Sequence, residues 1–306
     1  MTDKAELIKR IYLNNKNLSN AEIAAMINSS KRHVRRVLNP IRNGTLKQIK
    51  LPKILLFDIE TSPMEILTWG LYKQRPPYQN VVKEWSILSW SAKWLFSSEI
   101  ISQSVTTQEA INREDGSIIK RLWDLVDTAN IIVGHNSNKF DIRKSNVRFI
   151  KNNLPPPSSY QSIDTLLISK RYFAFSSYTL DYLTNLFDLT GKMHTSFDLW
   201  KRCIAGDKAA LEEMRIYNEQ DVRALEDLYI KLRPWIKSHP NLNLYVESEN
   251  SICPNCGSDN LTFCGEYYTT VSRFNSFRCE CGAIGRDKIS NLTKEEKERL
   301  IVPVAR

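Results

Sequence analysis

The sequence predicts an α/β domain, a mixed sheet with helices on its faces, between a small all-α segment and a small cysteine-rich module. From Ile54 onward, short apolar runs alternate with longer amphipathic runs, which is typical of such a domain. Before Ile54, apolar residues recur at helical spacing, and five of the six cysteines fall between residues 253 and 281. The expected boundaries are 1–44 for the all-α segment, 45–53 for a basic linker, 54–240 for the α/β domain, 248–292 for the cysteine module and 293–306 for a C-terminal tail.

Composition and charge argue against a membrane or secreted protein and favour one that binds a polyanion. Hydrophobic residues make up 42% of the chain, and no apolar run approaches the roughly 20 residues of a membrane-spanning helix. The charged start, MTDKAELIKR, lacks the apolar core of a secretory signal, so we expect a cytoplasmic protein without a membrane partner. Residues 1–53 hold 12 Lys and Arg against 3 Asp and Glu, which accounts for the whole net charge of +9. This surplus favours a polyanion such as nucleic acid as partner; the alternative is a charged face that only aids solubility.

The all-α segment is predicted to contain three short helices. Ser19 and Ser30 are suitable N-caps for the second and the third. The apolar positions that would form their core are Leu7, Ile8, Ile11, Ile23, Ala24, Ile27, Val34, Val37 and Leu38. The pattern resembles the helix-turn-helix modules of bacterial and phage DNA-binding proteins, in which one helix enters the major groove. The expected nucleic-acid contacts on the third helix are Lys31, Arg32, Arg35 and Arg36. A helical bundle that packs on the next domain or on another protein is the alternative.

Within the α/β domain, the apolar runs predict strands and the amphipathic runs predict helices. The expected strands are ILLFDI (54–59), the run around ILTWGLY (66–72), SILSWSAKW (86–94) and NIIVGHN (130–136). The expected helices cover 118–129, 141–153, 178–187 and 209–236, with a break at PPPSSY (155–160). Trp85, Trp90 and Trp94 are expected in the core; stacking on bases is the alternative.

Acidic residues stand where these elements end. Asp58 and Glu60 share one face of the first strand, because side chains alternate along a strand. Asp141 follows a later strand and a polar turn, and Tyr217 and Asp221 lie one turn apart on the last helix. Uncompensated carboxylates at one point would oppose one another's ionisation. Two Mg²⁺ or Mn²⁺ ions would remove that conflict and support phosphodiester chemistry, so we expect a metal-dependent phosphodiesterase site.

Three segments, FDIET, GHNSNKFD and YNEQD, carry a family resemblance. Over about residues 54 to 235 the chain resembles DEDD-type 3′–5′ exonucleases of ribonuclease H-like fold, which are related to the proofreading domain of family-B DNA polymerases. Tyr217 places it in the tyrosine branch; the histidine branch would have its histidine at Ile216.

The resemblance implies a role for each matching residue. Asp58, Glu60 and Asp221 would hold one metal ion near the attacking water, and Asp58 and Asp141 the second near the leaving oxygen. Tyr217 would orient the water, and Asn136 and Phe140 would shape the substrate's strand end. The implied reaction is in-line hydrolysis at a 3′ end that releases nucleoside 5′-monophosphates.

The cysteine module predicts a structural zinc site. Cys-x-x-Cys at residues 253–256 and Cys-x-Cys at 279–281 are each followed by a glycine, Gly257 or Gly282, which fits tight turns that let thiolates converge. The module resembles a zinc ribbon with Cys253, Cys256, Cys279 and Cys281 as ligands to one Zn²⁺. Cys264 is the alternative ligand, because the second pair has one intervening residue instead of two.

The sequence leaves alternatives to the exonuclease function. DNA is favoured over RNA because of the helix-turn-helix pattern, but no base-reading residue is evident. The same carboxylates could serve a structure-selective endonuclease. The chain could also be a DNA-binding regulator with an inactive nuclease fold, although all five motif residues are present.

Overall fold

The computed structural model describes residues 7–9, 11–12, 18–27, 29–42, 52–191, 195–246, 248, 250–302 and 304. Most of the predicted basic linker, residues 45–51, therefore lies outside the described residues, as do parts of the predicted first helix and of the C-terminal tail. The chain divides into two compact units, Lys53–Leu232 and a second unit made of Met1–Pro52 with Arg233–Arg306. None of the described helices is long and apolar enough to cross a lipid bilayer.

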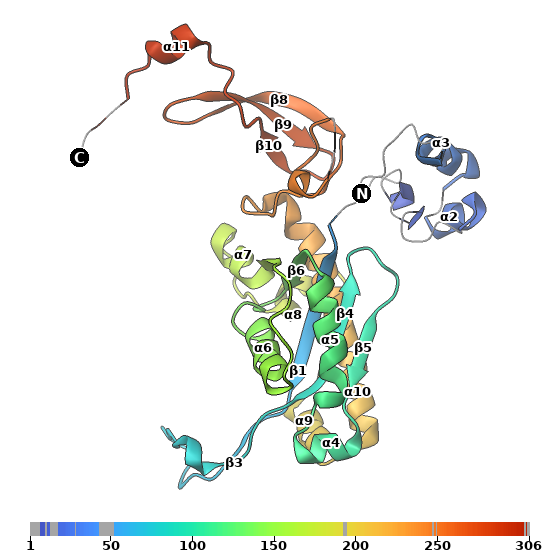
Figure 1. The fold of residues 1–306 in the computed structure, drawn as a ribbon, viewed down its shortest axis with the longest axis vertical. Coiled ribbons are helices and arrows are strands. Elements are labelled where there is room, and N and C mark those ends of the chain that lie inside the picture. Colours follow the sequence, from blue (N-terminus) through green and yellow to red (C-terminus); the bar gives the residue numbers. More distant parts are fainter. Residues whose placement is uncertain are drawn as a thin grey trace. The chain divides into compact units, whose positions relative to one another are not determined.

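The unit Lys53–Leu232 contains the predicted α/β domain (Figure 1). Its strands are β1 (Ile54–Thr61), β2 (Glu65–Ile66), β3 (Val81–Lys83), β4 (Ile87–Trp94), β5 (Ile101–Ser104), β6 (Ile131–Gly134) and β7 (Gln161–Asp164). Its helices are α4 (Thr107–Asn112), α5 (Gly116–Thr128), α6 (Asp141–Lys151), α7 (Thr165–Tyr172), α8 (Leu180–Leu186), α9 (Phe197–Ile204) and α10 (Lys208–Leu232), with a 3₁₀ turn η1 (Tyr78–Asn80).

Five of these strands form the predicted mixed sheet, in the order β5-β4-β1-β6-β7. β1 pairs parallel with β6, and β6 with β7, whereas β4 runs antiparallel to both β1 and β5. β1 is the central strand, and its first four residues are buried. A continuous apolar start of this kind is expected for a strand with both faces covered.

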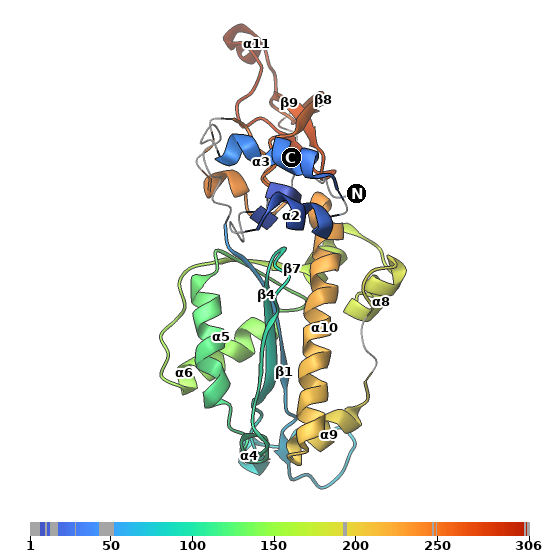
Figure 2. The same cartoon turned by 90° about the vertical axis from the view of Figure 1, so that its right-hand side faces the viewer.

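Helices cover both faces of the sheet. Figure 2 shows α5 and α6 on one side of β1 and β4, and α10 with α8 and α9 on the other. α10 packs directly on β1 and β4. Its buried residues include Leu211, Met214, Leu225 and Leu228, at the spacing that puts apolar side chains on one helix face. The arrangement confirms the predicted fold class and brings α10 against the strand that carries Asp58.

One predicted strand is wrong. ILTWGLY was expected to be a strand of the domain, but only Glu65–Ile66 is extended, and it pairs with β3 in a separate two-stranded sheet. Leu67, Trp69, Leu71 and Tyr72 are exposed. The segment is apolar enough to suggest a strand, but among the described residues no element buries it. By contrast Trp90, predicted in the core, is fully buried and donates from Nε1 to the carbonyl of Ile118 at 2.9 Å.

The N-terminal part of the second unit contains α2 (Asn20–Met26) and α3 (Lys31–Arg42). Both predicted caps are present: the hydroxyl of Ser19 accepts from the N–H of Glu22, and that of Ser30 accepts from the N–H of His33 at 3.2 Å. The buried residues that join the helices are Ile8, Ile23, Ala24, Ile27, Val34 and Leu38. The apolar periodicity thus identified the core of this segment correctly.

The C-terminal part of the second unit has short 3₁₀ turns η2 (Arg233–Trp235) and η3 (Leu242–Leu244), followed by strands β8 (Leu261–Tyr268), β9 (Arg273–Cys279) and β10 (Ile284–Arg286), and a short helix α11 (Lys294–Glu298). The three strands form an antiparallel sheet in the order β10-β9-β8. The buried cluster at one end of this sheet consists mainly of cysteines. A core this small is typical of a module that a metal stabilises.

Candidate active site

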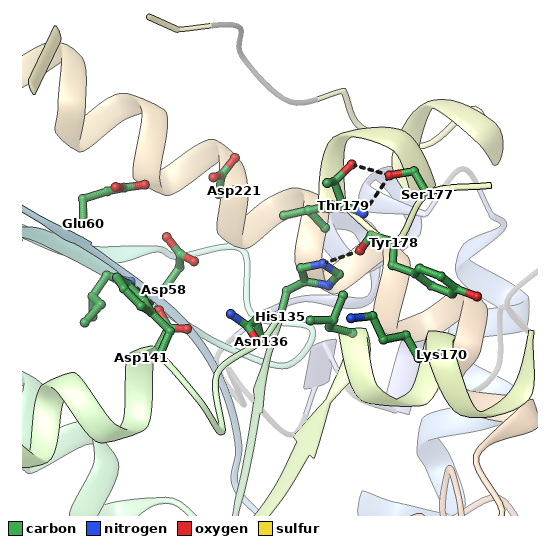
Figure 3. A pocket seen from close by; sticks show the side chains of 14 residues that line it. Asp58, Glu60, His135, Asn136, Asp141, Lys170, Ser177, Tyr178, Thr179 and Asp221 are labelled. Carbon is green, nitrogen blue, oxygen red and sulfur yellow. Dashed lines mark hydrogen bonds between the residues drawn. The ribbon is translucent and has the colours of Figure 1, made fainter. Parts of the chain in front are cut away.

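A cavity of about 620 Å³ lies beside the second half of β1 (Figure 3). Its walls come from β1, from the segment after β6, and from α6, α7, α10 and the segment before α8. Six residues predicted for the site line it: Asp58, Glu60, Asn136, Phe140, Asp141 and Asp221. The fold therefore brings the three sequence motifs to one place.

Three carboxylates form a cluster in this cavity. Asp58 and Glu60 leave the same face of β1, and Asp221 comes from α10, which packs on that strand. A carboxylate oxygen from each of the three lies within 4.8 Å of the other two. In Figure 3 the three side chains border a common space. Oxygen donors at this spacing can hold a hard divalent cation.

Asp141 lines the same cavity but is not part of that cluster. It is the first residue of α6, and its Oδ1 accepts a hydrogen bond from the backbone N–H of Ile59 at 3.1 Å. Ile59 lies between Asp58 and Glu60, so this bond joins α6 to the strand that carries two members of the cluster. Burial raises the pKa of Asp141 to about 7, and the nearby carboxylate of Asp164 acts in the same direction.

Asn218 is a residue of the site that the sequence motifs did not indicate. Its side chain is fully buried, and Nδ2 donates to Oδ2 of Asp58 at 2.5 Å. Its Oδ1 has no hydrogen-bond partner among the described residues, which is unusual for a buried amide. Asn218 precedes Asp221 by three residues on α10, so both lie on one face of the helix. That spacing is the signal by which it could have been found.

Tyr217 occupies the predicted position one turn before Asp221, but it does not line the cavity. Its side chain is 5% exposed and packs edge to face on Trp200, with ring centroids 6.1 Å apart. The structure thus places Tyr217 in the core beside the site and not on its wall.

The loop between β6 and α6 is held by Asp164, the last residue of β7. The Asp164 carboxylate accepts from the backbone N–H of Asn136 at 2.9 Å and from that of Asn138 at 3.1 Å. Asn136 has φ +66°, a left-handed conformation that Asn adopts more readily than most other residues. Asp164 therefore fixes the loop from which Asn136 and Asp141 reach the cavity. Sequence reasoning missed this role because β7 is only four residues long and begins with polar residues.

The wall away from the carboxylates combines two leucines, Leu166 and Leu180, with polar residues that were not predicted for the site: His135, Lys170, Ser177, Tyr178 and Thr179. The two ring nitrogens of His135 each lie 2.9 Å from an oxygen, Nδ1 from Oγ1 of Thr165 and Nε2 from the carbonyl of Tyr178. His135 thereby joins the end of β6 to α7 and to the segment before α8. This framework role agrees with its place inside the second motif, GHNSNKFD, before the turn that leads to Asp141.

The cysteine module contains a separate candidate metal centre. Thiol sulfurs of Cys253, Cys256, Cys279 and Cys281 lie within 4.8 Å of one another. The glycines after the two pairs have φ +77° and +91°, and their N–H groups donate to cysteine carbonyls of their own pairs at 2.9 Å. Cys264 is outside this group: it is exposed, and its thiol donates to Oγ of Ser276 at 3.5 Å. Four thiolates at this spacing suit Zn²⁺ in tetrahedral geometry.

The predicted nucleic-acid contacts of the N-terminal segment are accessible. Four basic residues are exposed on α3, while Val34 and Leu38 on the same helix are buried: Lys31, Arg32, Arg35 and Arg36. The helix therefore has an apolar face inward and a basic face outward, as a helix that contacts phosphates needs.

Comparison with known proteins identifies the superfamily of the α/β domain. A model of the RNase H superfamily matches residues 55–233, more than half of the chain. Among solved structures, the chain is similar to the family B DNA polymerase from the hyperthermophilic archaeon Pyrobaculum calidifontis, with 19% identity and a TM-score of 0.45 over 60% of this chain. The match spans 25% of the polymerase chain. The search of curated proteins finds no match. By its matching residues, which include β1 with Asp58 and α10 with Asp221, the chain belongs to the RNase H superfamily.

Proposed function

We propose that this protein is a metal-dependent 3′–5′ exonuclease that hydrolyses terminal phosphodiesters of nucleic acid, preferably DNA, and releases nucleoside 5′-monophosphates. Membership of the RNase H superfamily supports nuclease activity. The observation that carries the proposal is the cluster of Asp58, Glu60 and Asp221, with Asp141 on the same cavity. The 3′–5′ direction is supported by the resemblance of the three motifs to the tyrosine branch of DEDD exonucleases.

The donor set of the cavity fits two Mg²⁺ or Mn²⁺ ions. Carboxylates this close oppose one another's ionisation, and divalent cations remove the conflict. Asp58, Glu60 and Asp221 would hold one ion, and Asp58 with Asp141 the other. When bound, such ions stabilise negative charge on the attacking and leaving oxygens of phosphoryl transfer.

Other residues of the chain position these ligands. Asn218 holds Oδ2 of Asp58, and the N–H of Ile59 holds Oδ1 of Asp141, so neither carboxylate can rotate freely. Partners of this kind orient ligands and raise metal affinity. Tyr217 is assigned the orientation of the attacking water on its motif position alone.

The flanking parts are assigned supporting roles. The basic face of α3 would contact nucleic-acid phosphates. DNA is preferred to RNA because the segment resembles the helix-turn-helix modules of DNA-binding proteins. The four clustered cysteines would hold one structural Zn²⁺.

The test is digestion of 5′-labelled single- and double-stranded DNA and RNA with Mn²⁺ or Mg²⁺. Wild type is compared with Asp58→Ala and with Asp124→Asn, which changes an exposed carboxylate of α5 that does not line the cavity. We expect a ladder that shortens from the 3′ end, is lost in Asp58→Ala and is kept in Asp124→Asn.

A second substrate with a blocked 3′ end separates the alternatives. Cleavage of the blocked strand would favour an endonuclease. Binding without cleavage of any substrate would favour a DNA-binding regulator with an inactive site. Digestion of RNA but not DNA would overturn the assigned substrate while leaving the reaction in place.

A further inference from the structure

Residues 66–83 form an arm that leaves the five-stranded sheet between the end of β1 and the start of β4 (Figure 1). β2 and β3 pair at its base, and Leu67 and Asn80 continue the pairing: the Leu67 N–H donates to the Asn80 carbonyl at 2.9 Å, and Nδ2 of Asn80 donates to the Leu67 carbonyl at 3.0 Å. The arm is therefore an ordered extension of the β1–β4 pair.

The arm exposes aromatic side chains that the core does not use. Trp69 is fully exposed, and Tyr72 and Tyr78 are 83% and 81% exposed. Isolated exposed apolar residues need no explanation, but three aromatic rings on one short arm indicate a binding surface.

The charge of the arm indicates what it binds. Lys73, Arg75 and Lys83 lie in the arm, and Glu65, the acid of its paired base, contacts Lys83 at 3.7 Å, whereas the chain after residue 53 is balanced, with 31 basic and 31 acidic residues. Lys73 and Arg75 are exposed and stand between Tyr72 and Tyr78. Exposed aromatic rings that alternate with cations are the arrangement with which proteins bind single-stranded nucleic acid: rings stack on bases, and cations contact phosphates.

The base of the arm is fixed to the elements that carry the carboxylates. Glu65, five residues after Glu60, forms an ion pair with the buried guanidinium of Arg113 at 2.6 Å. At the return of the arm, the ring of Trp85 lies 3.6 Å from Nζ of Lys144, which is on α6 one turn after Asp141. The arm is thus connected to β1 on one side and to α6 on the other. Five extended residues span at most about 18 Å, so the base of the arm lies near the cavity.

We propose that this arm binds a single-stranded segment of the substrate and guides it to the carboxylate cavity. Trp69, Tyr72 and Tyr78 stack on bases, and Lys73 and Arg75 contact phosphates. This inference rests on the proposed function, because the polymer that the arm binds is taken to be the one that is cleaved in the cavity.

The test measures binding separately from cleavage. The affinity of the full chain for a fluorescein-labelled oligothymidylate is measured by anisotropy in EDTA, where a metal-dependent nuclease does not cut. The triple variant Trp69→Ala/Tyr72→Ala/Tyr78→Ala is compared with the ring-keeping variant Trp69→Phe/Tyr72→Phe/Tyr78→Phe. Phe197→Ala, which removes an exposed aromatic ring of α9 that is not part of the arm, is the matched control. Thermal unfolding checks that each variant is folded.

We expect the alanine variant to bind the oligonucleotide at least about a hundredfold more weakly, because it loses three stacks on bases. The phenylalanine variant and Phe197→Ala should stay close to wild type. Lys73→Ala/Arg75→Ala should reduce the slope of log affinity against log salt by about 1.4, the contribution of two phosphate contacts to a single strand.

Unchanged affinity of a folded alanine variant would overturn the arm as a binding surface, whatever the nuclease does. If the alanine variant no longer self-associates in sedimentation but binds the oligonucleotide as wild type does, the arm is an interface between copies of the chain. That result would also overturn the proposed binding of nucleic acid by the arm. The proposed nuclease function is judged by a different measurement, cleavage by wild type with Mn²⁺. If the protein binds the oligonucleotide through the arm but does not cleave it, the proposed binding role of the arm is supported and the proposed nuclease activity is overturned.

Discussion

Nδ2 of Asn218 lies 2.5 Å from Oδ2 of Asp58, although 160 residues separate the two in the sequence. The bond joins the middle of α10 to the central strand at the residue assigned to both metal ions. Asn218→Ala should lower activity and Mn²⁺ affinity by about tenfold to a hundredfold, the usual effect of losing a partner that orients a metal ligand. The measurement is the Mn²⁺ dependence of kcat. A shift in thermal stability alone, with the same Mn²⁺ dependence, would limit Asn218 to packing.

The carboxylate cluster should make the metal-free protein less stable than a variant with one carboxylate fewer. Asp221, which is 4% exposed, lies beside Asp58 and Glu60. Asp221→Asn should raise the melting temperature in EDTA by about 2–4 °C for each kcal/mol of repulsion removed. Mn²⁺ should stabilise wild type and have much less effect on the variant. Thermal unfolding with and without Mn²⁺ tests both, and equal stabilisation by Mn²⁺ would contradict the assigned ligand.

The pKa of Asp141 predicts how stability depends on pH. Burial raises this pKa to about 7 in the folded protein, from 3.8 for an unperturbed side chain. The folded state therefore keeps a proton that the unfolded chain releases, so the stabilisation is complete below about pH 4 and is lost as the pH rises through 7. Asp141→Asn should match wild type at about pH 4 and exceed it above pH 8 in EDTA, by an amount on the order of a few kcal/mol. Urea unfolding at the two pH values is the measurement. A constant difference would show that another group dominates.

Asp164 should be required for the shape of the cavity. Asp164→Ala leaves the N–H groups of Asn136 and Asn138 without their acceptor, which should cost about 1–3 kcal/mol of unfolding free energy and lower kcat. Asp164→Asn keeps an acceptor oxygen and should lose less. Urea unfolding and initial rates of the two variants decide this prediction. Equal losses in both would indicate that the charge matters more than the hydrogen bonds.

The two kinds of cysteine should respond differently to substitution. Cys281→Ser removes one of four converging thiols and should abolish stoichiometric zinc binding, whereas Cys264→Ser should retain it. Zinc content after dialysis is the measurement. Removal of zinc by a chelator should also unfold the module, because in so small a module the binding of the metal supplies most of the free energy of folding. Zinc retained in Cys281→Ser would require another ligand.

Long, strongly patterned segments could be predicted from the sequence. β1, β4, β6, α6 and α10 are present where apolar runs and helical periodicity indicated them. β6 is as short as β5 and β7 but continuously apolar, whereas β5 (ISQS) and β7 (QSID) were missed because polar residues interrupt them. The run ILTWGLY was wrongly expected to be a strand of the domain, because hydrophobicity alone does not distinguish a buried strand from an exposed arm.

For the site, motif spacing indicated the carboxylates, since side chains on one strand face or helix face share a direction. The spacing of Asn218 from Asp221 on α10 could have placed it at the site, but its bond to Asp58 could not be foreseen, because 160 residues separate the two. Asp164 could not be recognised in the same way, because Asn136 comes close to it only in the folded chain. Tyr217 shows the converse: its motif position is right, but packing on Trp200 puts the ring in the core.

The bond between α10 and β1 also determines when the protein can become active. A ribosome adds about 5–20 residues per second, so Asp58 and Glu60 emerge roughly 8–30 s before Asn218 and Asp221. Until α10 has been synthesised and has docked, the nascent chain carries only part of its carboxylate cluster. The carboxylate cluster is thus complete only after α10 has been synthesised and has docked on β1.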